Sequence, residues 1–157
     1  MNEQLREFLA NMLDWQQAHA SFDSAIADLP ASLRGERPEG LPYSVWELVE
    51  HIRIAQNDIL EFARDPGYKE DKKWPDDYWP ETPAPQSAEA WETSINRYHG
   101  DVEAFKKLIH DPAFDPFAKV PWGNGQTNIR EVVLVFDHTA YHVGQIVLVR
   151  RLLGAWK

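Results

Sequence analysis

The stretch Asp137-His138-Thr139-Ala140-Tyr141-His142-Val143-Gly144-Gln145 places two histidines four residues apart. On an α-helix, side chains at this spacing project from one face, one turn apart, so both imidazoles can reach one metal ion. Apolar residues flank the stretch on both sides, at 132–136 and 146–149. Two imidazoles in such surroundings need partners, because a buried polar group without one is costly. A metal ion is one such partner.

Working outward, four amphipathic segments with helical periodicity are separated by proline-rich connections. The predicted helices cover residues 2–29, 44–65, 87–111 and 127–153. Ser44, followed three residues later by Glu47, gives the second helix a capping-box pattern. Residues 66–86 carry five prolines together with Trp74, Tyr78 and Trp79, which predicts an ordered crossover laid over the helices.

Four such helices, no strand-like alternation and one long crossover predict an all-α four-helix bundle. The crossover between the second and third helices is long enough to lead from one end of the bundle to the other. We therefore expect these two helices to run parallel rather than as a hairpin. Residues 1–157 are expected to form a single domain.

The composition limits the classes of molecule that we expect the protein to bind. The formal net charge is −9, and lysine and arginine occur as scattered pairs rather than clusters, so we expect small-molecule substrates and no nucleic acid. The chain has no cysteine, which excludes disulfides, thiolate ligands and a cysteine nucleophile. No apolar run reaches the ~20 residues that a membrane span needs. The N-terminus lacks a basic start and an apolar signal core, so we expect a cytoplasmic protein without membrane contact.

A third histidine, His51, lies on the predicted inward face of the second helix. Helix bundles build metal sites from side chains on facing helices, so His51, His138 and His142 are candidate ligands. Three neutral imidazoles without a thiolate suit Zn, Ni, Cu or Fe better than Mg or Ca. A site with three protein ligands fits the catalytic kind, which keeps one position open. A second interpretation remains open at this point, in which the three histidines are only packed in the core.

Other polar residues could assist such a site. Glu47 and Asp58 lie one and two turns from His51 on roughly the same side, where either could orient an imidazole or transfer a proton. A solvated helix face explains these two carboxylates equally well. His19, on the inward face of the first predicted helix, is a further candidate for proton transfer, although packing is the commoner role. Gln145, one turn beyond the histidine pair, is placed to hydrogen-bond an imidazole.

Two segments, Tyr43–Ile52 and His138–Ile146, resemble the DinB superfamily, which includes bacillithiol transferase-like and mycothiol-dependent maleylpyruvate isomerase-like proteins. The resemblance covers nearly the whole chain. It implies a four-helix bundle of up-down-down-up topology and a divalent metal, usually zinc or nickel. The implied ligands are His51, His138 and His142. Many members of the family are homodimers, so the resemblance also implies a homodimer.

The best-understood relatives use the metal to activate a low-molecular-weight thiol for S-transfer or isomerisation. Because this chain has no cysteine, any such thiol would be external. Basic residues that would select a carboxylate-rich thiol are not clustered near the site, since Arg150 and Arg151 lie two to three turns beyond His142. The resemblance therefore implies a metal-dependent thiol S-transferase or hydrolase acting on a small electrophile. The alternative is a metal-binding stress-response module without catalysis.

Overall fold

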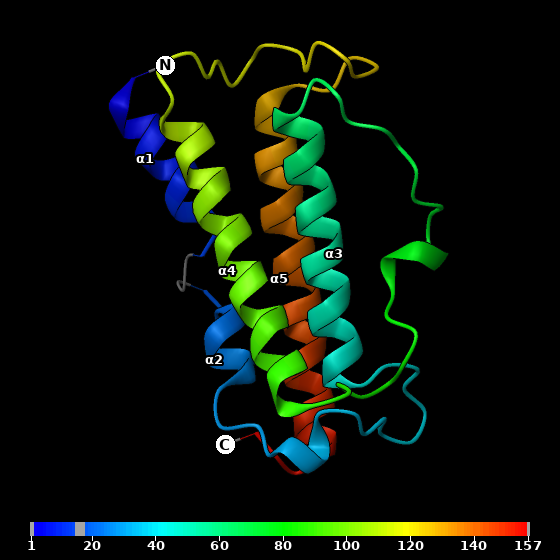
Figure 1. Ribbon diagram of the computed structural model, residues 1–157. Helices are drawn as coiled ribbons and strands as arrows, with labels where there is room; N and C mark the ends of the chain where they lie inside the picture. Colours follow the sequence, from blue (N-terminus) through cyan, green and yellow to red (C-terminus); the bar gives the residue numbers. More distant parts are fainter. Residues whose placement is uncertain (1, 15–17, 157) are drawn as a thin grey trace.

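The computed structural model describes residues 2–14 and 18–156 (Figure 1). The α-helices are α1 Glu3–Met12, α2 Phe22–Ile26, α3 Val45–Arg64, α4 Ala88–His110 and α5 Asn128–Leu152, with 3-10 turns at Ala31–Leu33 and Asp76–Tyr78. The residues within these bounds form no β-strand, and one isolated bridge joins Lys119 to Thr127. The prediction of an all-α protein is confirmed.

The three long helices form the centre of the molecule. In Figure 1, α3 and α4 run in the same direction, and α5 runs in the opposite one. The segment between α3 and α4 returns along the outside of α3, on the right of the figure, so the next helix starts again at the same end. Helix α3 packs against both α4 and α5, while α1 packs on α4 and α2 on α5. Facing surfaces of α3 and α5 therefore position the histidines discussed below.

The single first helix predicted over residues 2–29 is wrong. Two short helices replace it, because Ser21 adopts an extended conformation and caps a new helix, its hydroxyl accepting a hydrogen bond from the Ser24 amide at 3.2 Å. Serine side chains that bond to nearby backbone favour such starts over a helix interior. The helical periodicity of residues 2–29 predicts Phe8 and Trp15 on one buried apolar stripe, yet Phe8 is 48% exposed. Trp15 of the same stripe lies outside the described residues.

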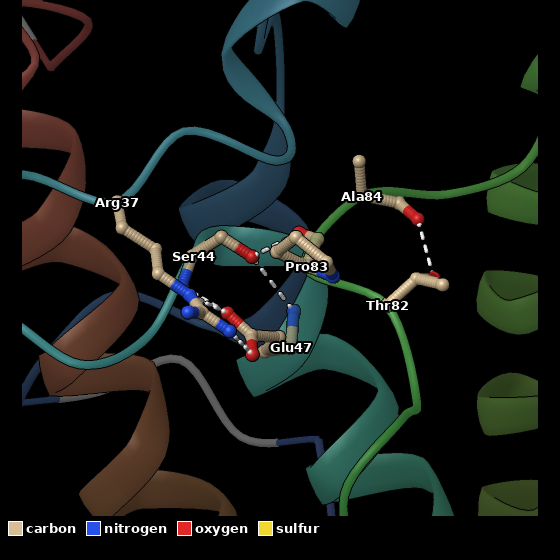
Figure 2. Close-up of polar contacts among 6 residues, drawn as sticks. All are labelled: Arg37, Ser44, Glu47, Thr82, Pro83 and Ala84. Carbon is tan, nitrogen blue, oxygen red and sulfur yellow. Dashed lines mark hydrogen bonds and ion pairs between the residues drawn. The ribbon is translucent and has the colours of Figure 1, made fainter.

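The predicted capping box at the start of α3 is confirmed (Figure 2). The Ser44 amide donates to Glu47 Oε2 at 2.8 Å, and the Glu47 amide donates to Ser44 Oγ at 3.2 Å. Arg37 binds the same carboxylate from the preceding loop, with its Nε donating to Oε2 at 2.8 Å. The Ser44 hydroxyl also donates to the carbonyl of Pro83, at the end of the crossover. These bonds fix the start of α3 between two loops.

Helix α5 is long and apolar enough to cross a membrane by length and composition alone. The expectation that no segment reaches this limit holds only for uninterrupted apolar runs, because averaging over the helix tolerates its few polar positions. Core helices of globular proteins pass the same test. In this structure α5 packs against α3 and α2, and its buried positions include Glu131, His142 and Arg150. The Arg150 Nη1 donates to the carbonyl of Ala25 at 2.6 Å, which ties the end of α5 to α2.

Candidate metal centre

Three histidines from two helices meet between α3 and α5. One ring nitrogen from each of His51, His138 and His142 lies within 4.8 Å of the others. The Nε2 atoms of His51 and His138 are 3.1 Å apart. The ring of His142 has its centroid 4.5 Å from each of the other two rings. The structure thus brings together all three histidines that the sequence singled out.

Two of these rings are oriented by hydrogen bonds at Nδ1. His51 Nδ1 lies 2.8 Å from the carbonyl oxygen of Tyr78, and His142 Nδ1 lies 2.7 Å from Gln145 Oε1. Because carbonyl oxygens only accept, Nδ1 carries the proton in both neutral rings and Nε2 carries the lone pair. Such partners fix the tautomer and orientation of an imidazole. Gln145 contacts His142, as its spacing suggested. The contact of His51 with the Tyr78 carbonyl could not be predicted in this way, because every residue has a main-chain carbonyl.

Two histidines of the group are buried, His138 is half-buried, and all three are uncharged. His51 is 1% exposed and His142 is 7% exposed. Burial lowers the pKa of His138 to about 3, with further lowering by His142 and His51. Burial also lowers the pKa of His142 to about 4 against the opposing hydrogen bond of Gln145, and it lowers the pKa of His51 against the bond to Tyr78. The imidazoles are therefore neutral near pH 7, the form that binds metals.

Aromatic residues of the crossover cover the group. The Trp79 ring stacks on His51 with centroids 3.9 Å apart and planes within 2°, and Tyr43 stacks on Trp79 at 4.2 Å. The Trp79 ring therefore lies between His51 and Tyr43. Trp74 is 68% exposed, with its ring centroid 6.3 Å from that of His51. The prediction of an ordered crossover lying on the helices is confirmed.

Asp58 acts on the crossover rather than on a histidine. Its carboxylate accepts hydrogen bonds from the Tyr78 hydroxyl at 2.6 Å, the Lys72 ammonium at 3.1 Å and the Tyr68 hydroxyl at 3.3 Å. Burial and the nearby carboxylate raise the pKa of Tyr68 to about 12. Since the same Tyr78 accepts from His51 through its carbonyl, Asp58 positions the imidazole indirectly.

The other two predicted proton-transfer candidates lie apart from the histidine group. Glu47 is occupied by Arg37 and Ser44 at the start of α3. His19 is exposed, belongs to no described helix, and has its Nδ1 2.8 Å from the carbonyl oxygen of Ala20. It lines a separate cavity of about 510 Å³ on the side of α5 that faces α2 and α4. Neither residue has a hydrogen bond to the three histidines among the described contacts.

A carboxyl group that sequence reasoning left without a role adjoins the site. Glu131, seven residues before His138 on α5, is 1% exposed and lines the same cavity as that histidine. Both of its oxygens lie near Arg130 Nη1, at 2.9 and 3.1 Å. Burial raises the pKa of Glu131, and Arg130 opposes the rise. The seven-residue spacing between Glu131 and His138 could have indicated this position, because it puts the two residues two turns apart on the same helix face.

Comparison with known families agrees with this geometry. A family model described as the DinB superfamily matches residues 14–146, a range that contains all three histidines. Comparisons with curated proteins and with solved structures give no match. The matched range extends over most of the chain, from before α2 to within α5. The chain therefore belongs to the DinB superfamily.

Proposed function

We propose that His51, His138 and His142 bind one divalent transition metal, zinc or nickel, and that the protein is a metal-dependent enzyme. The observation that carries this proposal is the convergence of three neutral imidazoles. The 3.1 Å between two Nε2 atoms supports it. Two ligand nitrogens, each 2.0–2.1 Å from a tetrahedral centre, would lie about 3.3 Å apart.

The donor set also fits such a metal. Nδ1 is engaged with Tyr78 in one ring and with Gln145 in another, so Nε2 is left as the ligand atom in both. Among the residues that the structure describes, no carboxylate joins the group of three histidines. Imidazole ligands suit zinc and nickel better than magnesium or calcium, and three protein ligands are typical of catalytic sites.

In the proposed reaction, a low-molecular-weight thiol loses its proton, forms a C–S bond to a small electrophilic substrate and displaces the leaving group, which departs with the proton. In the alternative reaction, water takes the place of the thiol and the substrate is hydrolysed. A divalent metal held by the histidines would supply a lowered pKa for that nucleophile near neutral pH. The chain itself contributes orientation, because Tyr78 and Gln145 hold two imidazoles, and exclusion of water, because Trp79 covers His51. The thiol would be external, since the chain has no cysteine.

The proposal includes the wider expectations for the chain. Residues 1–157 would form one domain, a four-helix bundle of up-down-down-up topology in which α1 and α2 together take the first position. The parallel course of α3 and α4 in Figure 1 supports this arrangement. We further propose a cytoplasmic homodimer with a small-molecule substrate and neither nucleic-acid nor membrane partners, in keeping with the net charge of −9.

The second candidate function is a non-catalytic metal-binding module of a stress response. The close stacking of Trp79 on the nearly inaccessible His51 favours it, because a covered metal would not meet a substrate. The cavity of about 490 Å³ favours the enzyme instead, because His138, one of the three histidines, lines it.

Elemental analysis of protein purified without a histidine tag tests the proposal. We expect about one zinc or nickel ion per chain, lost in His138→Ala and kept in His99→Ala, since a three-imidazole site does not survive loss of a ligand. His99 is a suitable control because it pairs with Asp23 on the other side of the molecule. Metal retained by His138→Ala, or absent from reconstituted wild type, would contradict the proposal. Activity with thiols and a chromogenic electrophile then separates the enzyme from the non-catalytic module.

A further inference from the structure

A cavity of about 490 Å³ adjoins the histidine group at His138. Its walls come from α3, α5, the crossover after α3 and the loop before α5. The loop is held in place by Trp122, whose Nε1 donates to the carbonyl of Phe62 at 2.7 Å. A volume of this size is typical of a site for a small organic molecule.

The cavity is rich in aromatic rings. They come from α3, the crossover and the loop: Phe62, Tyr68, Trp74, Tyr78 and Trp122. Phe62 and Tyr68 meet edge to face at 5.3 Å, and Trp74 and Tyr78 do so at 5.2 Å. Asp58 fixes both tyrosines through their hydroxyls. A set of fixed rings offers negative π-faces, which attract organic cations.

The charges of the lining are also those of a cation site. Three acidic residues line it, namely Asp58, Glu70 and Glu131. Two of these carboxylates already have basic partners, because Lys72 Nζ binds Asp58 at 3.1 Å and Arg130 Nη1 binds both oxygens of Glu131. Glu70 has no ion pair within the described part of the chain. A net charge of −9 adds a field of the same sign.

We propose that this cavity binds a small organic ammonium ion, with the cationic group at Glu70, the apolar part among the rings and the Glu131–Arg130 pair in the same lining. Glu131 precedes His138 by seven residues, about 10.5 Å along the helix axis, so a ligand of that length reaches both. The claim that this ammonium compound is the substrate of the metal-dependent reaction rests on the proposed function. Its binding to the cavity does not require the metal. Carboxylate-rich thiols such as glutathione or bacillithiol would meet like charges here.

Three probes of similar shape test the charge preference: phenethylamine, 2-phenylethanol and phenylacetate place an ammonium, a hydroxyl and a carboxylate on the same phenyl body. They are titrated by calorimetry into metal-free protein, with tryptophan fluorescence as a second signal because Trp74 and Trp122 line the cavity. We expect phenethylamine to bind about tenfold more tightly than 2-phenylethanol, with phenylacetate weakest. Equal binding of the three, or tightest binding of phenylacetate, would overturn the proposal.

Variants locate the ammonium group. Glu131→Gln keeps the shape of the side chain but leaves the Arg130 charge without its carboxylate partner in the lining. It should therefore remove most of the tenfold preference for phenethylamine while leaving 2-phenylethanol unchanged. Glu92→Gln, at an exposed position of α4 away from the cavity, is the matched control and should keep the preference. Glu70→Lys, at an exposed position, covers the case in which Glu131→Gln does not fold. It should weaken phenethylamine and strengthen phenylacetate. Wild-type preference in both variants would refute the proposal.

The zinc content of the same preparations separates this inference from the proposed function. A preference for phenethylamine in protein that binds no zinc supports the ammonium site while the metal proposal fails. If the protein binds zinc through His138 but binds the three probes without a charge preference, the metal proposal stands and the ammonium site is overturned.

Discussion

The two sides of α5 carry cavities of similar size, about 510 Å³ towards α2 and α4 and about 490 Å³ towards α3 and the crossover. Histidines line both of them. On the first side, His19 contacts the Ala20 carbonyl and His99 pairs with Asp23 at 3.0 Å, so each finds its own partner. On the second side, three histidines face one another. The proposed metal site is thus distinguished from the other cavity by convergence of neutral imidazoles, not by cavity volume or histidine count.

The largest expected difference between the two sides is the effect of acid on metal-free protein. Above about pH 6.5, the usual pKa of histidine, both folded and unfolded states hold neutral imidazoles. Below it the unfolded chain takes up protons, while His142 stays neutral to about pH 4 and His138 to about pH 3. The free energy of unfolding should therefore fall with decreasing pH by up to about 1.4 kcal/mol per pH unit for each histidine.

Urea unfolding at pH 7, 6 and 5 measures this fall. His138→Gln should reduce the slope, and Thr139→Ser, a change without a titratable group on the other side of α5, should leave it unchanged. An identical slope in wild type and His138→Gln would mean that the buried group does not resist protonation, and the contrast between the two sides would be lost.

The next effect concerns the hydrogen bond from His142 to Gln145. Gln145→Ala should weaken zinc binding by about 10–100-fold, because removal of a partner that orients a ligand typically has this effect. Competition with a chromogenic chelator gives the affinity. His19→Ala, which changes the other cavity, serves as the control and should keep the wild-type affinity. Equal affinities for Gln145→Ala and wild type would show that the imidazole needs no orientation.

The last comparison is between two tryptophans of the crossover. Trp79→Ala removes the ring between His51 and Tyr43 and should lower the free energy of unfolding by about 1–3 kcal/mol. Trp74→Ala, at a 68% exposed position, should change it by less than about 0.5 kcal/mol. Zinc release to a chelator should be faster for Trp79→Ala alone. Similar values for both variants would show that the cover has no energetic role.

What could be predicted from the sequence is mostly local. Ser44 with Glu47, and Ser87, mark the starts of α3 and α4 because capping depends on residues within one turn. The spacing of His138 and His142 needs only the helix repeat. The first helix was mispredicted because its apolar stripe continues past the point where Ser21 starts α2. Here a local polar contact prevails over periodicity.

The contacts made by the crossover could not be predicted in this way. Trp79 on His51 and Asp58 beneath Tyr78 join residues of α3 to a proline-rich segment without periodicity. The composition indicated that the segment is ordered, yet nothing in it specifies which ring meets which histidine. Glu131 was given no role from the sequence for the same reason, because the cavity that it lines has a wall supplied by the crossover.

The bond between His51 and Tyr78 has a consequence for how this chain can vary. The acceptor is a main-chain oxygen, so almost any residue at position 78 that keeps the local turn would still orient the imidazole. The Tyr78 hydroxyl, in contrast, is needed only for its contact with Asp58. Random substitution at position 78 would therefore loosen the anchoring of the crossover while sparing the tautomer of His51. Position 145 has no such tolerance, because there the acceptor is the side chain itself.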